Sequence, residues 1–178
     1  MASVLASGAG PAAAAEPGLV DGFAAALRGC ETWVLDPTSW RDGPQRFVAS
    51  MTGAVTVSRP QMIPDRAQPP AGLRRGNEYW RVSGPGRAGF FLITSTEIPM
   101  CHIVGDAQGD YGSSVAAVLA SARFVARWER SGERAVGGRI VTTFLNRTAP
   151  DLELTVSRPA ADGPGPGGEV TATARALD

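Results

Sequence analysis

The stretch from Ala88 to Gly105 constrains the fold of this chain more than any other segment. It reads AGFFLITSTEIPMCHIVG and is the most apolar run in the sequence, interrupted once by the polar segment 95–97. Two short apolar runs on either side of a polar turn are typical of a strand hairpin. We therefore predict two central strands, over 89–94 and 99–104, joined by this turn.

The flanking segments carry helix and strand patterns of their own. Apolar residues at helical spacing predict a short amphipathic helix over 19–30 and a long helix over 113–130. Serine before the long helix, arginines in its last turns and Gly132 just beyond it are favourable end signals. Alternation predicts further strands, and Pro44 suits the first turn of a second short helix. These strands cover 33–35, 52–58, 77–83, 138–146, 151–156 and 169–176, and the short helix covers 44–51.

The order of these elements predicts an α+β fold. We expect an antiparallel sheet of five to six strands, with the long helix (about 113–130) packed on one face and the shorter helix (about 19–30) nearby. A chain of 178 residues is one domain by the usual relation between length and domain number. We assign that domain to 16–178, with the Pro-rich segment 59–76 as a long surface loop and the Gly/Pro-rich segment 159–168 as a flexible hairpin end.

The first fifteen residues differ from the rest of the chain because they contain no charge. Ala13, Ala14 and Ala15 before Glu16 match the small-residue cleavage site of a secretory signal, whereas the basic beginning of such a signal is missing. Two interpretations follow for 1–15: the remnant of a signal peptide, cleaved after Ala15, or a disordered Ala/Gly/Ser/Pro arm. Under both interpretations this segment lies outside the folded domain.

Composition excludes several classes of function. The chain contains no lysine, so all 17 of its cationic side chains are arginine, and chemistry that needs a lysine amine is excluded. Together with the missing lysine, the heavy use of Ala, Gly and Pro indicates a GC-rich, bacterial genome. A formal net charge of zero gives no reason to expect nucleic acid or an anionic membrane as a partner. No apolar run approaches the ~20 residues that span a bilayer, so we predict no membrane span.

The two cysteines, Cys30 and Cys101, do not have the spacing of a zinc site, and one histidine cannot build a His-rich metal site. We predict no metal and no cofactor. If the protein is exported, a disulfide between Cys30 and Cys101 is expected, because oxidising compartments form and keep such bonds. In a cytosolic protein the same two residues are expected as buried, reduced cysteines.

Cys101 and His102 also suggest a thiol nucleophile with its base, completed by an acid from the 106–110 loop. Strand geometry argues against this pair, because consecutive side chains on a strand point to opposite faces. The segment 84–89 matches G-x-G-x-x-G, but a strand follows it where a dinucleotide site needs a helix. We therefore predict no nucleotide site there.

Three hypotheses for function follow. The first is a small exported bacterial protein without enzymatic activity, which binds another protein or a ligand in the periplasm. The second is a thiol or hydrolytic enzyme centred on Cys101 and His102. The third is a cytosolic accessory subunit that binds its partner through the Pro-rich loop 59–76.

Overall fold

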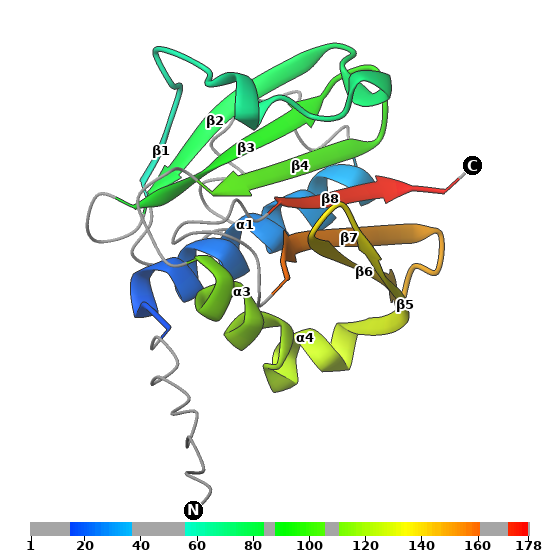
Figure 1. The fold of residues 1–178 in the computed structure, drawn as a ribbon. Helices are drawn as coiled ribbons and strands as arrows, with labels where there is room; N and C mark the ends of the chain where they lie inside the picture. The colour runs from blue at the N-terminus through cyan, green and yellow to red at the C-terminus, as the bar shows by residue number, and fades with distance from the viewer. Residues whose placement is uncertain (1–14, 37–55, 84–87, 106–110, 161–170, 178) are drawn as a thin grey trace, which may run out of the picture.

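The computed structural model describes residues 15–36, 56–83, 88–105, 111–160 and 171–177. These residues form one eight-stranded antiparallel sheet with three α-helices on one of its faces (Figure 1). The helices are α1 (Pro17–Leu35), α3 (Tyr111–Leu119) and α4 (Ala122–Arg127), and two 3-10 turns are η2 (Asp65–Ala67) and η3 (Ala71–Leu73). The strands are β1 (Thr56–Ser58), β2 (Asn77–Ser83), β3 (Gly89–Ser95), β4 (Met100–Gly105), β5 (Trp128–Val136), β6 (Arg139–Asn146), β7 (Leu152–Pro159) and β8 (Thr171–Ala176).

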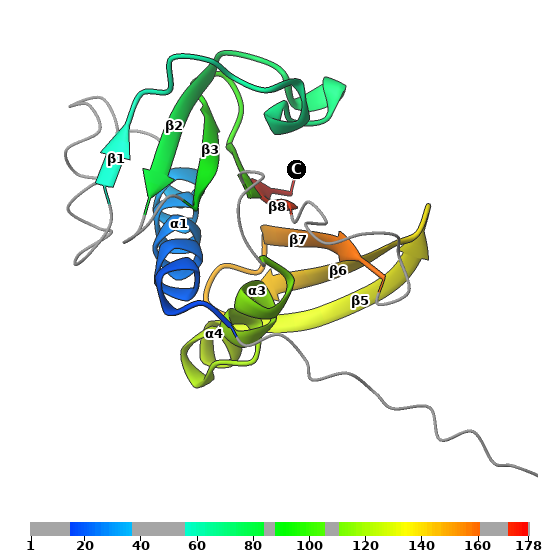
Figure 2. The same cartoon turned by 60° about the vertical axis from the view of Figure 1, so that its left-hand side comes forward.

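The sheet consists of two four-stranded meanders that meet edge to edge. Its strand order is β1-β2-β3-β4-β8-β7-β6-β5, so the last strand of the first meander pairs with the last strand of the second. In the chain, each meander comes after one or two helices: α1 precedes β1–β4, and α3 and α4 precede β5–β8. Figure 2 shows the two meanders as two wings of a bent sheet, with all three helices against its inner side.

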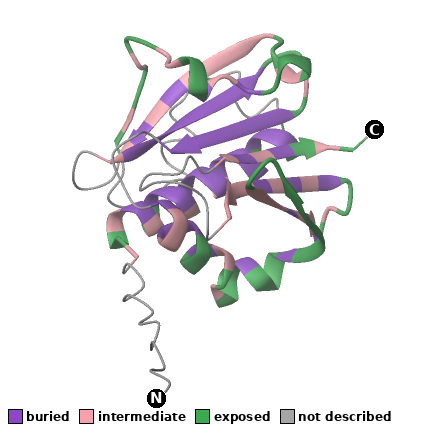
Figure 3. Cartoon of the chain, viewed as in Figure 1, coloured by how far each residue is buried: buried purple, intermediate pink, exposed green. Residues whose placement is uncertain are grey.

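The main core lies between the sheet and the helices. It combines buried residues of α1, such as Phe23 and Leu27, with inward-facing residues of both meanders, such as Leu92 and Leu154. Burial is deepest in β3 and β4, where every residue is buried (Figure 3). These are the two strands of the predicted central hairpin, which the structure confirms. Both faces of these two strands are covered, which explains why their sequences are continuous apolar runs.

The outer face of β3 and β4 is covered by the Pro-rich segment 59–76. Ala67 of η2 is fully buried against Phe91, Ile93 and Val104, and Ile63 packs beside them. The Tyr79 hydroxyl donates a hydrogen bond to Gln68 Oε1 at 2.8 Å, which holds the segment to β2. The segment thus forms a second, smaller core layer in addition to connecting two strands.

The predicted fold class is wrong in its strand number and in its helices. The sheet has eight strands where five to six were expected, and strand takes up 43% of the described residues against 32% for helix. In place of one long helix over 113–130, the chain forms α3, α4 and then β5. The longest described helix is α1, which continues from the predicted 19–30 through Leu35 and includes the segment 33–35 that alternation had predicted as strand.

Two local features explain the corrected helices. Ser121 has an extended backbone and its Oγ accepts a hydrogen bond from the Phe124 amide, so it ends α3 and caps α4. In α1, Trp33 stays helical because its indole is buried and donates to the carbonyl of Ser95 at 3.1 Å. A tertiary contact therefore decides the conformation of a residue with a high strand propensity.

Several predictions lie wholly or partly outside the described residues: the arm 1–15 except Ala15, the short helix 44–51, and most of the loop 159–168. Of the predicted strand 52–58, the structure describes Thr56–Ser58, which is β1. In the described part of the chain, no helix is both long enough and apolar enough to cross a membrane.

Candidate ligand-binding groove

The two cysteines are joined, as the sequence predicts for an oxidising compartment. Cys30 of α1 and Cys101 of β4 form a disulfide with their Cα atoms 5.2 Å apart. Both residues are at most 1% exposed, and the bond fastens α1 to the middle of the sheet. Because both sulfur atoms are in this bond, Cys101 carries no thiol in the structure, and catalysis by a Cys101 thiolate has no structural basis in this oxidised state.

His102 lies on the opposite face of β4 from Cys101, as strand alternation requires. Its side chain is buried, and Nδ1 is 2.8 Å from the Thr173 hydroxyl oxygen on β8. Burial lowers the pKa of His102 from 6.5 to about 4, so the ring is neutral at ordinary pH. The structure thus does not bring Cys101 and His102 together, and the loop 106–110 that was to supply an acid lies outside the described residues.

A different site becomes visible only in the folded chain. An open groove of about 540 Å³ lies between the α3–α4 segment and the β5–β7 half of the sheet. We call it the basic groove. Its lining residues are Ala116, Leu119, Ala120, Phe124, Val125, Trp128, Arg130, Glu133, Thr142, Phe144, Arg147 and Arg158.

Strand register explains why lining residues from β5, β6 and β7 face the same way. Arg130 lies opposite Phe144, and beyond a bulge at the next residues Glu133 lies opposite Thr142. Phe144 in turn lies opposite Leu154 of β7, and Arg158 is four residues farther along the same face. Side chains distant in the sequence are therefore collected on one face of the sheet.

The floor of the groove is an aromatic cluster. The Phe124 ring stacks on Trp128 at 6.1 Å between centroids and meets Phe144 edge-on at 5.0 Å. All three residues are 5–7% exposed, so only a small part of each side chain is open to the groove. Because each ring is held by its neighbours, the floor is a rigid apolar surface.

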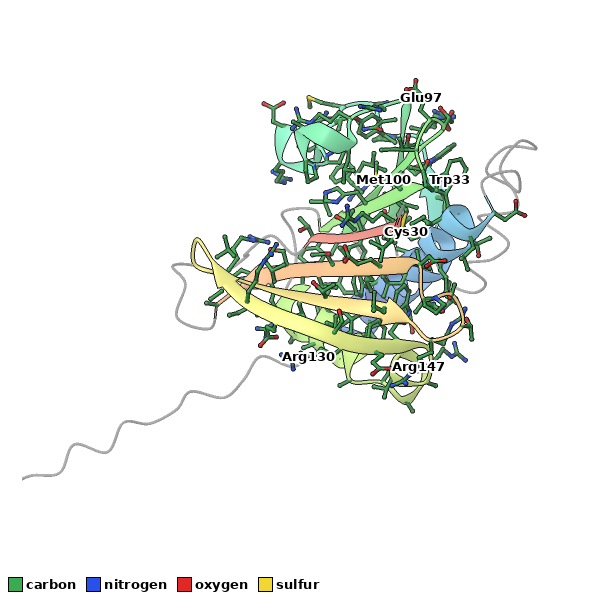
Figure 4. The ribbon with its side chains drawn as sticks, turned by 90° about the vertical axis from the view of Figure 1, so that its right-hand side faces the viewer. Cys30, Trp33, Glu97, Met100, Arg130 and Arg147 are labelled. Carbon is green, nitrogen blue, oxygen red and sulfur yellow. A yellow bond between two sulfur atoms is a disulfide. The ribbon has the colours of Figure 1, made fainter. Side chains whose placement is uncertain are left out.

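The rim of the groove is basic. Arg130 pairs with Glu133 at 2.6 Å and Arg147 pairs with Glu129 at 3.0 Å, whereas Arg158 forms no ion pair with any residue that the structure describes. Figure 4 shows Arg130 and Arg147 along the β5 side of the sheet. With three arginines and one glutamate in the lining, positive charge exceeds negative.

Glu133 is held in its charged form by its surroundings. The Thr142 hydroxyl donates to Glu133 at 2.8 Å, and this hydrogen bond is the largest cause that lowers the pKa of the carboxyl group. The positive charges of Arg130 and Arg158 lower the pKa further, against a desolvation effect that raises it. The one lining carboxylate is therefore already engaged by groups of the protein.

A buried polar network supports the groove from below. Glu31 of α1 is 6% exposed and accepts hydrogen bonds from Arg127 at 2.5 Å and from Asn146 Nδ2 at 2.8 Å. The side-chain oxygen Oδ1 of Asn146 accepts hydrogen bonds from the backbone amides of Thr148 and Ala149. These contacts hold α1, α4 and the end of β6 together, and with them the positions of Phe124 and Arg147.

A second pocket lies on the other side of α4, between that helix and α1, and measures only about 50 Å³. Arg28, Arg123 and Arg127 line it together with Glu31. Burial, followed by the positive charge of Arg123, lowers the pKa of Arg28. The sequence indicated the arginines of this region only as a favourable signal at the end of a helix, and apolar periodicity assigned Leu119, Phe124 and Trp128 to that helix without indicating a groove.

Comparison of the chain with protein-family models, with curated proteins and with solved structures finds no match. Among the described residues, no three His, Cys, Asp or Glu side chains lie close enough together to hold a metal ion. The geometry of the groove and the disulfide are therefore the observations from which a function can be argued.

Proposed function

We propose that this chain is an exported bacterial protein without enzymatic activity, which binds a ligand in the basic groove in an oxidising compartment such as the periplasm. The observation that carries the proposal is the Cys30–Cys101 disulfide. Disulfides persist in oxidising compartments and are rare in the reducing cytosol. A buried bond between the first helix and the central hairpin suits a protein that must stay folded outside the cell membrane.

The binding part of the proposal rests on the groove. Its volume of about 540 Å³ is within the range of small-molecule sites, and it combines an apolar floor with a few charged groups. The absence of enzymatic activity rests on the state of the two residues that suggested catalysis. Cys101 is in a disulfide, and His102 is buried and hydrogen-bonded to the Thr173 hydroxyl group.

Thiol labelling of the protein expressed from its own genomic locus tests the proposal. We expect the protein in the periplasmic fraction, with no cysteine alkylated after denaturation and both alkylated once a reductant is added. Alkylation of Cys30 and Cys101 without reductant, in a cytosolic fraction, would contradict it. The thiol-enzyme and accessory-subunit hypotheses stay predictions from the sequence: the first requires a free thiol at Cys101, and the second requires a cytosolic location.

A further inference from the structure

The geometry points to a small anionic amphiphile, with a carboxylate head and an apolar body, as the ligand of the basic groove. This inference rests on the proposed function, because it assigns a chemical class to the ligand of the same groove. It is carried by two features of the groove: its apolar floor lies at one end, and Arg158, an arginine without an ion pair among the described residues, lies at the other.

The apolar body would lie against the helix side of the groove. There Phe124, Trp128 and Phe144 form the floor, and Leu119 also lines the groove. Val125 is 51% exposed, an unusual exposure for a valine at the side of an apolar floor. A ligand with a hydrocarbon body would remove this surface from water, which is the favourable part of binding.

The carboxylate would lie at the other end, at Arg158. Counted along β7, Arg158 is four residues beyond Leu154, the partner of Phe144, which is roughly 13 Å along a strand. Arg130 and Arg147 each form an ion pair, whereas Arg158 forms none with a described residue, although its charge acts on Glu133 from farther away. A guanidinium without an ion pair at the end of an apolar groove favours a ligand that brings a carboxylate into hydrogen-bonding distance.

Charge also excludes the opposite class of ligand. A cationic head group would need a free carboxylate, but Glu133 already accepts from Thr142 and Arg130. The remaining lining charges are Arg147 and Arg158, which would repel a cation. A neutral amphiphile would gain only the apolar contacts, so the groove should discriminate among the three classes by the head group.

Calorimetric titration of the full oxidised chain with three ligands of the same chain length tests this inference. The ligands are decanoate, decanol and decyltrimethylammonium, each below its aggregation concentration. We expect decanoate to bind about ten-fold more tightly than decanol, as a charge-assisted hydrogen bond would give, and the cation to show no measurable binding.

Two variants locate the site and a third serves as the control. Arg158→Gln should weaken decanoate about ten-fold and leave decanol unchanged, because it removes only the charged contact. Ala116→Phe fills the groove from an exposed position of α3 and should weaken both ligands. Arg134→Gln removes an arginine from the opposite face of β5, where it faces away from the groove beside Val141, and should change neither.

Equal affinity for decanoate and decanol, or equal loss of decanoate binding in R158Q and R134Q, would overturn the inference. Binding of an acidic peptide without binding of decanoate would overturn it as well, and would assign the groove to a protein partner. The proposed function fails in other ways. If the cysteines are free thiols in the cytosol and decanoate still binds, the proposal of export is wrong and this inference stands. If none of the three probes binds, the groove is not a small-ligand site and this inference is wrong as well.

Discussion

The imidazole of His102 is held neutral by burial alone. It is 4% exposed and lies on the same face of β4 as Val104, which packs against Ala67 of the segment 59–76. Its contact with the Thr173 hydroxyl needs no charge on the ring. Sequence alternation placed Cys101 and His102 on opposite faces, and the structure agrees. The sequence does not show how deeply His102 is buried, because burial depends on contacts between segments that are distant in the chain.

This burial predicts a loss of stability in mild acid. The folded pKa of His102 is about 4 and its unfolded value is 6.5, so the unfolded chain takes up the proton first as the pH falls. The contribution of neutral His102 to the free energy of unfolding is complete above pH 6.5. It should fall by at most about 3 kcal/mol as the pH approaches 4. Chemical denaturation at several pH values measures it.

His102→Asn keeps a polar group near Thr173 and removes the titration. Its free energy of unfolding should therefore change less than that of the native chain between pH 6.5 and pH 4. Identical pH profiles for the two proteins would mean that His102 does not titrate as its burial implies.

At the scale of elements, the segment 111–136 shows why the long helix was predicted and why it does not form. The apolar stripe of α3 and the Phe124–Trp128 spacing continue in one helical register across Ser121, so periodicity alone could not find the break. The N-cap hydrogen bond of Ser121 restarts the helix in a new direction.

β5 was missed for a different reason. Eight of its nine residues are exposed, so it has no alternating apolar pattern by which to recognise a strand. One signal did exist in the sequence: the Gly137–Gly138 pair before a strand is typical of a tight hairpin turn. In the structure these two glycines have the φ values of 55° and 75° that such a turn requires. A hairpin turn before β6 requires a partner strand just before the turn, in the region where we predicted the end of the long helix.

The cap at Ser121 gives a prediction at this scale. Ser121→Ala removes the acceptor for the Phe124 amide and should lower the free energy of unfolding by about 1 kcal/mol. Ser121→Asp supplies another acceptor and serves as the matched control. Urea denaturation compares the three proteins, and an equal loss in the alanine and aspartate variants would show that the hydroxyl does not act as a cap.

At the scale of the whole molecule, the disulfide acts on the fold more than on chemistry. Cys30 and Cys101 are 71 residues apart in sequence, and the bond closes that loop between α1 and β4. The junction of the two meanders lies beside it, because Cys101 is paired with Ala174 of β8. The bond therefore restrains the first helix at the place where the two halves of the sheet meet.

Replacing both cysteines by alanine should lower the free energy of unfolding by roughly 4 kcal/mol, the chain-entropy value for a loop of this length. Denaturant titration of the oxidised native chain and of the double variant measures the difference. A reductant should destabilise the native chain and leave the variant unchanged. Equal stability of the two oxidised proteins would contradict a structural role for the bond.

The sequence by itself determined the central hairpin and the strands now seen as β2, β6, β7 and β8. These are local properties, since side-chain periodicity and turn residues are carried by each segment alone. The tertiary structure decided the β4–β8 junction, the division of α3 from α4 and the basic groove. Phe124, Arg130 and Arg158 meet there through strand register and helix packing, which depend on contacts between distant segments and leave no periodic trace in any one of them.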